Sequence, residues 1–237
     1  MTLFRHLIWA ALAAIAASGF ASLGFWQFQR GEHKEQWLSN YVSAMEAKAI
    51  PLHEALLSNE PRSIPVRVSG ELEFHSSPLI LLDNQQRDGR VGVRAYSLAS
   101  VEGSQKSVLV ELGWLPMPAD RALPKITTPK NQKVDGVLLA WPSQGIRLAA
   151  NPWPEGADTV LLMYLEHQEI AEKSSTSLYD GVLQPVPSPD FGYVRDAGTL
   201  PNTLPPERHR GYAVQWWGLS VTVVVVYFIL AWRRKPR

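Results

Sequence analysis

Two long uncharged apolar segments, one near each end of the chain, set the strongest constraint on how this sequence can fold. Leu7–Trp26 and Tyr212–Trp232 contain no Asp, Glu, Lys or Arg. A helix rises about 1.5 Å per residue, so about 20 apolar residues cross the hydrocarbon of a bilayer. We therefore predict that each segment forms a membrane-spanning helix. Gly19 and Gly24 give the first one a small-residue face for close packing against the second or against a partner's helix.

The first segment has an alternative interpretation, a cleaved secretory signal. Arg5 before an apolar stretch and the small residues of Ala17–Ala21 fit that pattern. The apolar run is long for a signal peptide, however, and it continues to Trp26 without a polar region. A retained helix is the favoured interpretation.

Basic residues beside the two segments predict the orientation, since Lys and Arg concentrate on the cytoplasmic side of membrane proteins. Arg5 precedes the first segment, and a basic run, Arg233, Arg234, Lys235 and Arg237, follows the second. Both termini are thus predicted to be cytoplasmic. The predicted parts are a cytoplasmic N-terminus (1–6), a first span (7–26), an extracytoplasmic domain in the periplasm or intermembrane space (27–211), a second span (212–232) and a cytoplasmic basic tail (233–237).

The composition excludes several classes of function. The chain has no cysteine, which rules out disulfides, thiolate metal sites and cysteine catalysis. Its 23 basic and 22 acidic residues give a net charge of +1, with no sign of a nucleic-acid-binding face. The six histidines do not show the spacing of a helical zinc site, and no phosphate-binding loop or nucleophile elbow is present.

Between the spans, the hydrophobic pattern predicts a domain made mainly of short strands. A helix is expected to continue past Trp26 until Pro51 interrupts it. Strands are expected at 64–74, 78–83, 91–100, 107–116, 134–141, 146–150 and near 181–186. Asp88-Gly89 is the expected turn of a hairpin loop. The segment from Thr159 can start as a strand, but the helical spacing of its later part predicts a helix. The whole is an integral membrane protein with two transmembrane helices that flank an α+β domain, mainly an antiparallel sheet or small barrel.

His209 has the most unusual setting of the histidines, three residues before the second span. At the outer membrane interface its imidazole can ligate the iron of a flat amphiphilic cofactor. The alternative, which spacing alone favours, is a polar residue that faces lipid headgroups together with Arg208 and Arg210. Trp26 and Gln27 end the first span at the same surface, where they can bind a ligand, join the helices or anchor the interface, and the anchor is favoured.

Four separated blocks of sequence resemble a known family. They are LGFWQFQR (Leu23–Arg30), GRVGVRAYSL (Gly89–Leu98), VLVELGWLP (Val108–Pro116) and HRGYAVQWWGL (His209–Leu219). In this order they resemble the surfeit-locus-one family of assembly factors for haem-copper cytochrome c oxidase. The resemblance implies a multi-pass protein of the bacterial plasma membrane, or its mitochondrial counterpart, that helps insert or hold haem a in the oxidase catalytic subunit and is not an enzyme. The implied partners are that subunit, haem a synthase and membrane lipids, with no nucleic acid.

The resemblance also assigns candidate residues to haem binding. His209 stands where the family has a histidine before a Tyr-Ala pair and a Trp, which are Tyr212, Ala213 and Trp216 here. The resemblance therefore implies that His209 is the axial ligand of the haem iron. The other expected haem contacts are Trp26, Gln27, Tyr212 and Trp216.

The chain departs from the family pattern at two places. Glu111-Leu112 stand where the family commonly has Asn-Arg, and Pro206-Glu207-Arg208 replace an Asn-rich approach to the histidine. Two other classes of function stay open. One is a membrane scaffold that binds oxidase or other membrane-protein subunits without haem. The other is an outer-face hydrolase or sugar-binding enzyme, which requires a cleft with convergent polar residues.

Overall fold

The computed structural model describes residues 2–57, 65–142, 150–195 and 204–233. The chain forms two compact units: a helical unit, Met1–Trp37 with Thr203–Arg237, and a barrel unit, Leu38–Asn202. Both apolar segments of the sequence belong to the helical unit, whereas the predicted strands belong to the barrel unit.

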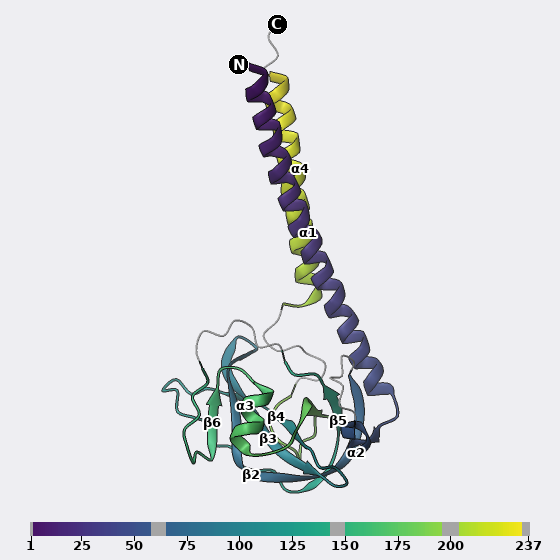
Figure 1. The fold of residues 1–237 in the computed structure, drawn as a ribbon, viewed down its shortest axis with the longest axis vertical. Coiled ribbons are helices and arrows are strands. Elements are labelled where there is room, and N and C mark those ends of the chain that lie inside the picture. The colour runs from purple at the N-terminus through teal and green to yellow at the C-terminus, as the bar shows by residue number, and fades with distance from the viewer. Residues whose placement is uncertain (1, 58–64, 143–149, 196–203, 234–237) are drawn as a thin grey trace. The chain divides into compact units, whose positions relative to one another are not determined.

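The helical unit contains most of α1 (Thr2–Glu46), purple in Figure 1, and α4 (Pro206–Arg233), yellow in the same figure. Both helices are long and apolar enough to cross a membrane. Only 11% and 6% of the residues in their most apolar windows are buried, so their apolar side chains require a lipid covering. The two predicted helices are confirmed, and α1 continues past Trp26 as predicted, ending at Glu46 before Pro51.

The two helices pack antiparallel along one seam of α1 that repeats every three or four residues. Ser220 Oγ donates a hydrogen bond to the carbonyl of Ala17 (2.8 Å), and the rings of Phe20 and Trp216 stack with centroids 5.7 Å apart. This spacing is typical of helices that cross at a small angle, where side chains of one helix fill gaps between those of the other.

Gly24 lies on this seam and faces the side chain of Trp217. A Cβ at this position would lie 2.4 Å from Nε1 of Trp217, which is closer than real atoms come, so the ring would have to move. A Cβ on Gly19, in contrast, would have no atom within 4 Å. Of the two glycines on the predicted small-residue face, Gly24 is thus the one that packs against α4.

The barrel unit is built on a seven-stranded sheet that closes on itself. Its strands are β1 (Ile50–Pro51), β2 (Val66–Arg87), β3 (Arg90–Val101), β4 (Ser107–Pro116), β5 (Gln132–Leu139), β6 (Thr159–Leu162) and β7 (Leu178–Pro185). Pairing follows the order β2-β3-β4-β7-β5, and β5 pairs back with β2. The predicted barrel is confirmed, but the sheet is mixed, because β1–β2, β2–β6 and β4–β7 pair in parallel.

Strand β2 can pair with several neighbours because the two strands predicted before the hairpin merge in it. A register shift between Phe74 and Leu79 marks the place where it bends. The chain then turns at Asp88 and Gly89, whose φ angles of 49° and 73° are those of a left-handed hairpin turn. The Asp-Gly turn is therefore confirmed.

The helix predicted from Thr159 is wrong in its first part. Thr159–Leu162 is strand β6, which pairs with β2 and alternates between half-buried and buried positions. The helix α3 spans His167–Ser174 only. The helical spacing belongs to these later residues. Thr159–Leu162 begins with two β-branched residues, which suit a strand at the edge of a sheet. The strand predicted at 146–150 lies almost entirely within 143–149, outside the described residues.

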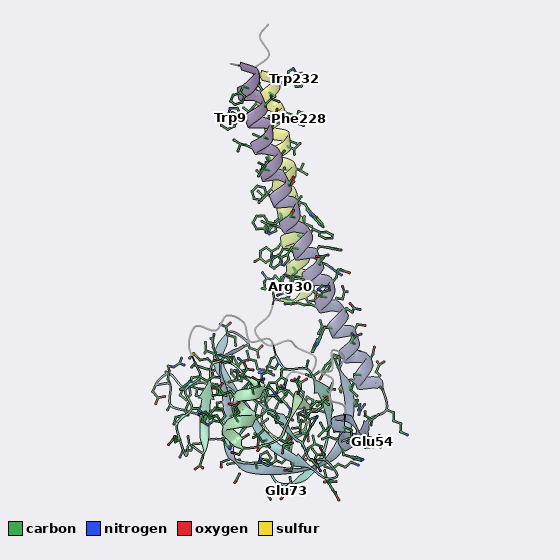
Figure 2. All side chains as sticks on the ribbon, viewed as in Figure 1. Trp9, Arg30, Glu54, Glu73, Phe228 and Trp232 are labelled. Carbon is green, nitrogen blue, oxygen red and sulfur yellow. The ribbon has the colours of Figure 1, made fainter. Side chains whose placement is uncertain are left out.

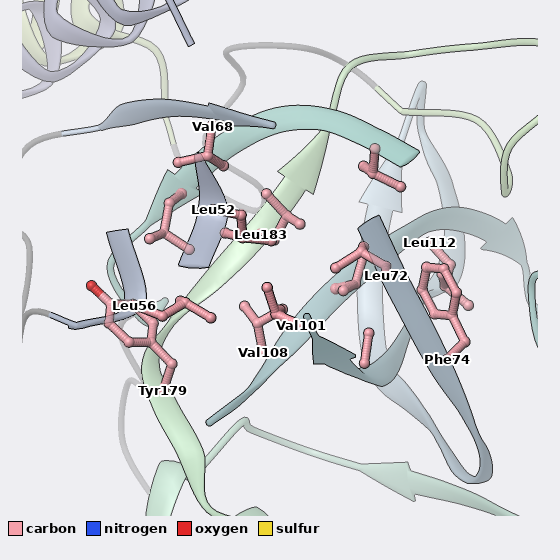
Figure 3. Packing of buried hydrophobic residues seen from close by; sticks show 14 of the residues in the cluster. Leu52, Leu56, Val68, Leu72, Phe74, Val101, Val108, Leu112, Tyr179 and Leu183 are labelled. Atoms are coloured by element: carbon pink, nitrogen blue, oxygen red, sulfur yellow. The ribbon is translucent and has the colours of Figure 1, made fainter. Parts of the chain in front are cut away.

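Buried apolar side chains form two clusters on opposite faces of the barrel strands, since the neighbours Ile80 and Leu81 of β2 belong to different clusters. One includes Leu52 and Leu56 of the short helix α2 (Leu52–Leu57), seen in Figure 3 beside Tyr179. The other lies beneath β6 and α3. Full burial of one such side chain contributes about 1.5–3 kcal/mol, so the two leucines fasten α2 to the core.

A buried polar network occupies the barrel at Glu111, one of the positions that departs from the family pattern. Arg94 Nη1 lies 2.5 Å from Glu111 Oε1, and Gln184 Nε2 donates to the second carboxylate oxygen at 3.2 Å. Tyr41 in the last turns of α1 donates its hydroxyl to Gln184 Oε1 at 2.9 Å. Burial, with a further contribution from the charge of Glu111, raises the pKa of Tyr96. The network joins the end of α1 to β3, β4 and β7.

Candidate functional site

The start of α4 places His209 against α1. Pro206 begins the helix, where the missing N–H of proline leaves no donor unpaired. Three residues later the side chain of His209 lies at the contact between the helices and is only 7% exposed. This histidine is therefore not a lipid-facing residue of an exposed basic group, as the alternative interpretation of its spacing proposed.

Gln27 of α1 holds the imidazole of His209. The Nδ1 atom of His209 lies 2.7 Å from Gln27 Oε1. Because an amide oxygen only accepts hydrogen bonds, Nδ1 carries the hydrogen and donates it. In the neutral ring the lone pair is then on the other nitrogen, Nε2. Two residues that the sequence singled out at the ends of different spans thus lie in direct contact.

The Nε2 atom of His209 is buried and has no hydrogen-bond partner among the described residues. A buried polar atom without a partner costs about 1–3 kcal/mol, so such atoms in folded proteins usually have a purpose. Histidines that ligate metals share this arrangement, with one ring nitrogen donating to an oxygen acceptor and the other free to bind. The geometry suits His209 to ligation of a metal centre.

A glycine lets α1 come close to this histidine. A Cβ on Gly31 would lie 3.3 Å from the carbonyl oxygen of Pro206 and 3.5 Å from Cβ of His209. Gly31 follows Gln27 by one helical turn, on the same seam as Gly24. The sequence interpretation did not include Gly31, although the three-and-four spacing of Phe20, Gly24, Gln27 and Gly31 could have indicated it.

Charged residues surround the histidine on its outer side. Arg210 pairs with two carboxylates of α1, Glu32 at 2.9 Å and Glu35. Lys34 Nζ donates to the carbonyl of Leu204 at 2.5 Å, and Arg30 makes no ion pair with any residue that the structure describes. Arg30 and Lys34 therefore place positive charge beside His209 without an ion-pair partner among the described residues. The sequence did not predict this feature.

The other predicted contact residues lie on different faces of the helix pair. Trp216 is half-buried and stacks on Phe20, about two helical turns from His209. Trp26 is 51% exposed and Tyr212 is 39% exposed, so both present rings to the surroundings of the pair. The structure brings His209 and Gln27 together, places Trp216 on the same seam, and leaves Trp26 and Tyr212 at its exterior.

A serine–histidine pair in the barrel unit bears on the hydrolase alternative. His75 Nε2 lies 2.9 Å from Ser100 Oγ. Ser100, but not His75, lines a surface hollow of about 390 Å³. Burial lowers the pKa of His75, and Glu73 opposes this effect. A hydrolytic site also needs a group that orients the histidine and donors for an oxyanion. The hollow is instead lined by three glutamates, Glu71, Glu73 and Glu102, whose charge disfavours an oxyanion.

Comparison with known proteins shows which family these features belong to. The chain matches the SURF1 family over residues 14–221. It is a member of the SURF1 family. Among similar proteins, a SURF1-like protein of Rickettsia felis is 24% identical over an alignment of 224 residues, with 88% of this chain and 90% of that one covered. A SURF1-like protein of Rickettsia conorii is 23% identical over an alignment of 228 residues, with 90% of this chain and 86% of that one covered.

The family match confirms the resemblance seen in the four sequence blocks. It begins inside α1 and ends inside α4, so it includes the barrel unit and the part of both helices that contains Gln27 and His209. The match of this SURF1-family chain therefore does not rest on the apolar segments alone.

Proposed function

We propose that this protein is a membrane-bound assembly factor for haem-copper cytochrome c oxidase, and that it holds haem a for the catalytic subunit through His209. The observation that carries the proposal is the buried Nε2 of His209, which has no partner while Nδ1 donates to Gln27. Family membership supports the wider role, since the resemblance to oxidase assembly factors covers both helices and the domain between them.

The residues around His209 fit a haem. Haem iron binds an imidazole nitrogen at an axial position, and this bond would satisfy the orphaned Nε2. Gln27 keeps the ring in the required tautomer, and the apolar seam below it, with Trp216, gives a porphyrin edge an apolar neighbour. Trp26 and Tyr212 are the other proposed contacts. The chain has no cysteine to attach the cofactor covalently, which suits a protein that passes haem on.

The proposed location follows from the flanking charges. Both termini lie in the cytoplasm, the two spans cross the bacterial plasma membrane, and the barrel unit lies in the periplasm. In this orientation His209 and Gln27 lie near the outer membrane surface. The proposed partners are the oxidase catalytic subunit and haem a synthase, and lipids surround both spans.

Titration of the detergent-purified protein with haem a tests the proposal. We expect saturable binding with a shifted Soret band, and His209→Ala should weaken it at least about tenfold, because one axial bond is lost. His33→Ala is the matched control, since His33 is an exposed histidine of α1, and it should bind as the unaltered protein does.

The same titration, together with a test of copurification with oxidase subunits, distinguishes a haem-binding protein from a scaffold that binds no haem. A protein that binds no haem a, yet copurifies with oxidase subunits, would contradict the haem role and favour the scaffold. Equal binding by the unaltered protein and His209→Ala would contradict the assignment of His209 while leaving a haem role in place.

A further inference from the structure

Two cations lie on the same side of α1 as the residues that contact His209. Arg30 and Lys34 follow Gln27 at three and seven positions, and Gly31 follows it at four, so these positions share one helix face. A Cβ on Gly31 would lie 3.5 Å from Cβ of His209, so this face of α1 packs against the start of α4. Figure 2 shows Arg30 on α1 beside the first turns of α4.

The two carboxylates of α1 that lie nearest to these cations in the sequence are already engaged. Glu32 and Glu35, the acidic residues between and beside them, both pair with Arg210. Within the described part of the chain, neither Arg30 nor Lys34 forms an ion pair, and Lys34 has only the carbonyl of Leu204. Like charges four residues apart on a helix repel each other. An anionic ligand placed between Arg30 and Lys34 would remove this repulsion.

We propose that Arg30 and Lys34 bind the propionate carboxylates of the haem whose iron is held by His209. This inference rests on the proposed haem-binding function. A haem carries its two carboxylates on one edge, while the rest of the ring is apolar. A guanidinium matches a carboxylate with two parallel hydrogen bonds, and an ammonium acts as a compact charge with three donors, so Lys34 can keep Leu204 as well.

The position of the two cations also sets the direction of the bound ring. Both lie beyond Trp26 on the part of α1 that follows the predicted span, whereas Phe20 and Trp216 lie within the spans. The charged edge of the haem therefore points toward water, and the apolar edge lies toward the hydrocarbon. This arrangement avoids the large cost of placing carboxylates in the bilayer.

Comparison of haem a with haem a dimethyl ester tests the proposal, because the ester lacks the negative charges but keeps the iron. Both ligands are titrated into the full chain in an uncharged detergent. We expect the double variant Arg30→Gln/Lys34→Gln to bind haem a at least about tenfold more weakly, which is the usual strength of a hydrogen bond to a charged group. Its affinity for the ester should equal that of the unaltered protein, which also shows that the variant is folded.

Two further variants separate the proposed carboxylate site from the proposed haem-binding function on which it rests. Arg208→Gln removes the same charge from an exposed arginine next to His209, and it should change the affinity for either ligand less than twofold. His209→Ala should weaken both ligands alike. If the double variant binds haem a as the unaltered protein does, or loses both ligands equally, the carboxylate site is wrong and the haem role stands. If the unaltered protein binds neither ligand, the proposed function and this inference both fail.

Discussion

Gln27 decides which nitrogen of His209 is free. Its amide oxygen accepts the hydrogen of Nδ1, so a neutral ring presents Nε2 as the base. Without this acceptor, the imidazole can place its hydrogen on either nitrogen and can rotate about its side chain. Residues in this supporting position usually change metal affinity by about 10–100-fold when they are replaced. Gln27 is therefore expected to matter almost as much as the ligand itself.

The variant Gln27→Leu tests this role, because leucine keeps a similar volume but accepts no hydrogen bond. We expect haem a affinity to fall by about tenfold or more, with the Soret position of the remaining complex unchanged, since the same nitrogen still binds. Gln29→Leu, at an exposed position of the same helix, should leave the affinity unchanged. A Gln27→Leu protein with normal affinity would show that packing alone orients the ring.

Close packing of α1 and α4 brings Gln27 to His209. Gly24 contributes to this packing because its lack of a side chain leaves room for Trp217 of α4. We expect Gly24→Leu to destabilise the detergent-solubilised protein by about 1–3 kcal/mol, the usual cost of overpacking, because the added side chain meets Trp217. Gly19→Leu adds the same side chain where nothing lies within 4 Å, so it is the control. Thermal unfolding of the two variants measures the difference, and equal midpoints would contradict the seam.

Some elements could be predicted from the sequence, and the reasons for the others are physical. The two apolar helices and the Asp88-Gly89 turn were predicted correctly because each depends on a local pattern. Strand β6 was mistaken for helix because its pairing with β2 comes from a segment about 80 residues earlier in the chain, which local periodicity does not indicate. The contact between Gln27 and His209 depends in the same way on the register of two helices that are distant in sequence.

The molecule consists of two units, so haem binding and recognition of an oxidase subunit can be assigned to different units. The proposed haem contacts belong to the helical unit, whereas the barrel unit has its own core and its buried network around Glu111. Under the proposed function, the barrel unit is the part available to recognise an oxidase subunit, and the proposed orientation places it on the outer side of the membrane. That role requires the barrel unit to lie outside, and the orientation can be measured directly.

The absence of cysteine makes the chain well suited to this measurement, because a single introduced thiol is then the only one. We expect Glu73→Cys, at an exposed position of the barrel unit, to react with a membrane-impermeant maleimide in intact spheroplasts. Lys235→Cys, in the basic tail, should react only after lysis, because cytoplasmic flanks retain Lys and Arg. The reverse pattern would invert the protein and place His209 at the cytoplasmic surface, which is incompatible with the proposed location of the haem site. The variant Phe4→Cys tests whether the first apolar segment is retained, because its thiol can be labelled after lysis only if that segment stays on the chain. A mature protein that has lost this thiol would favour the cleaved-signal alternative.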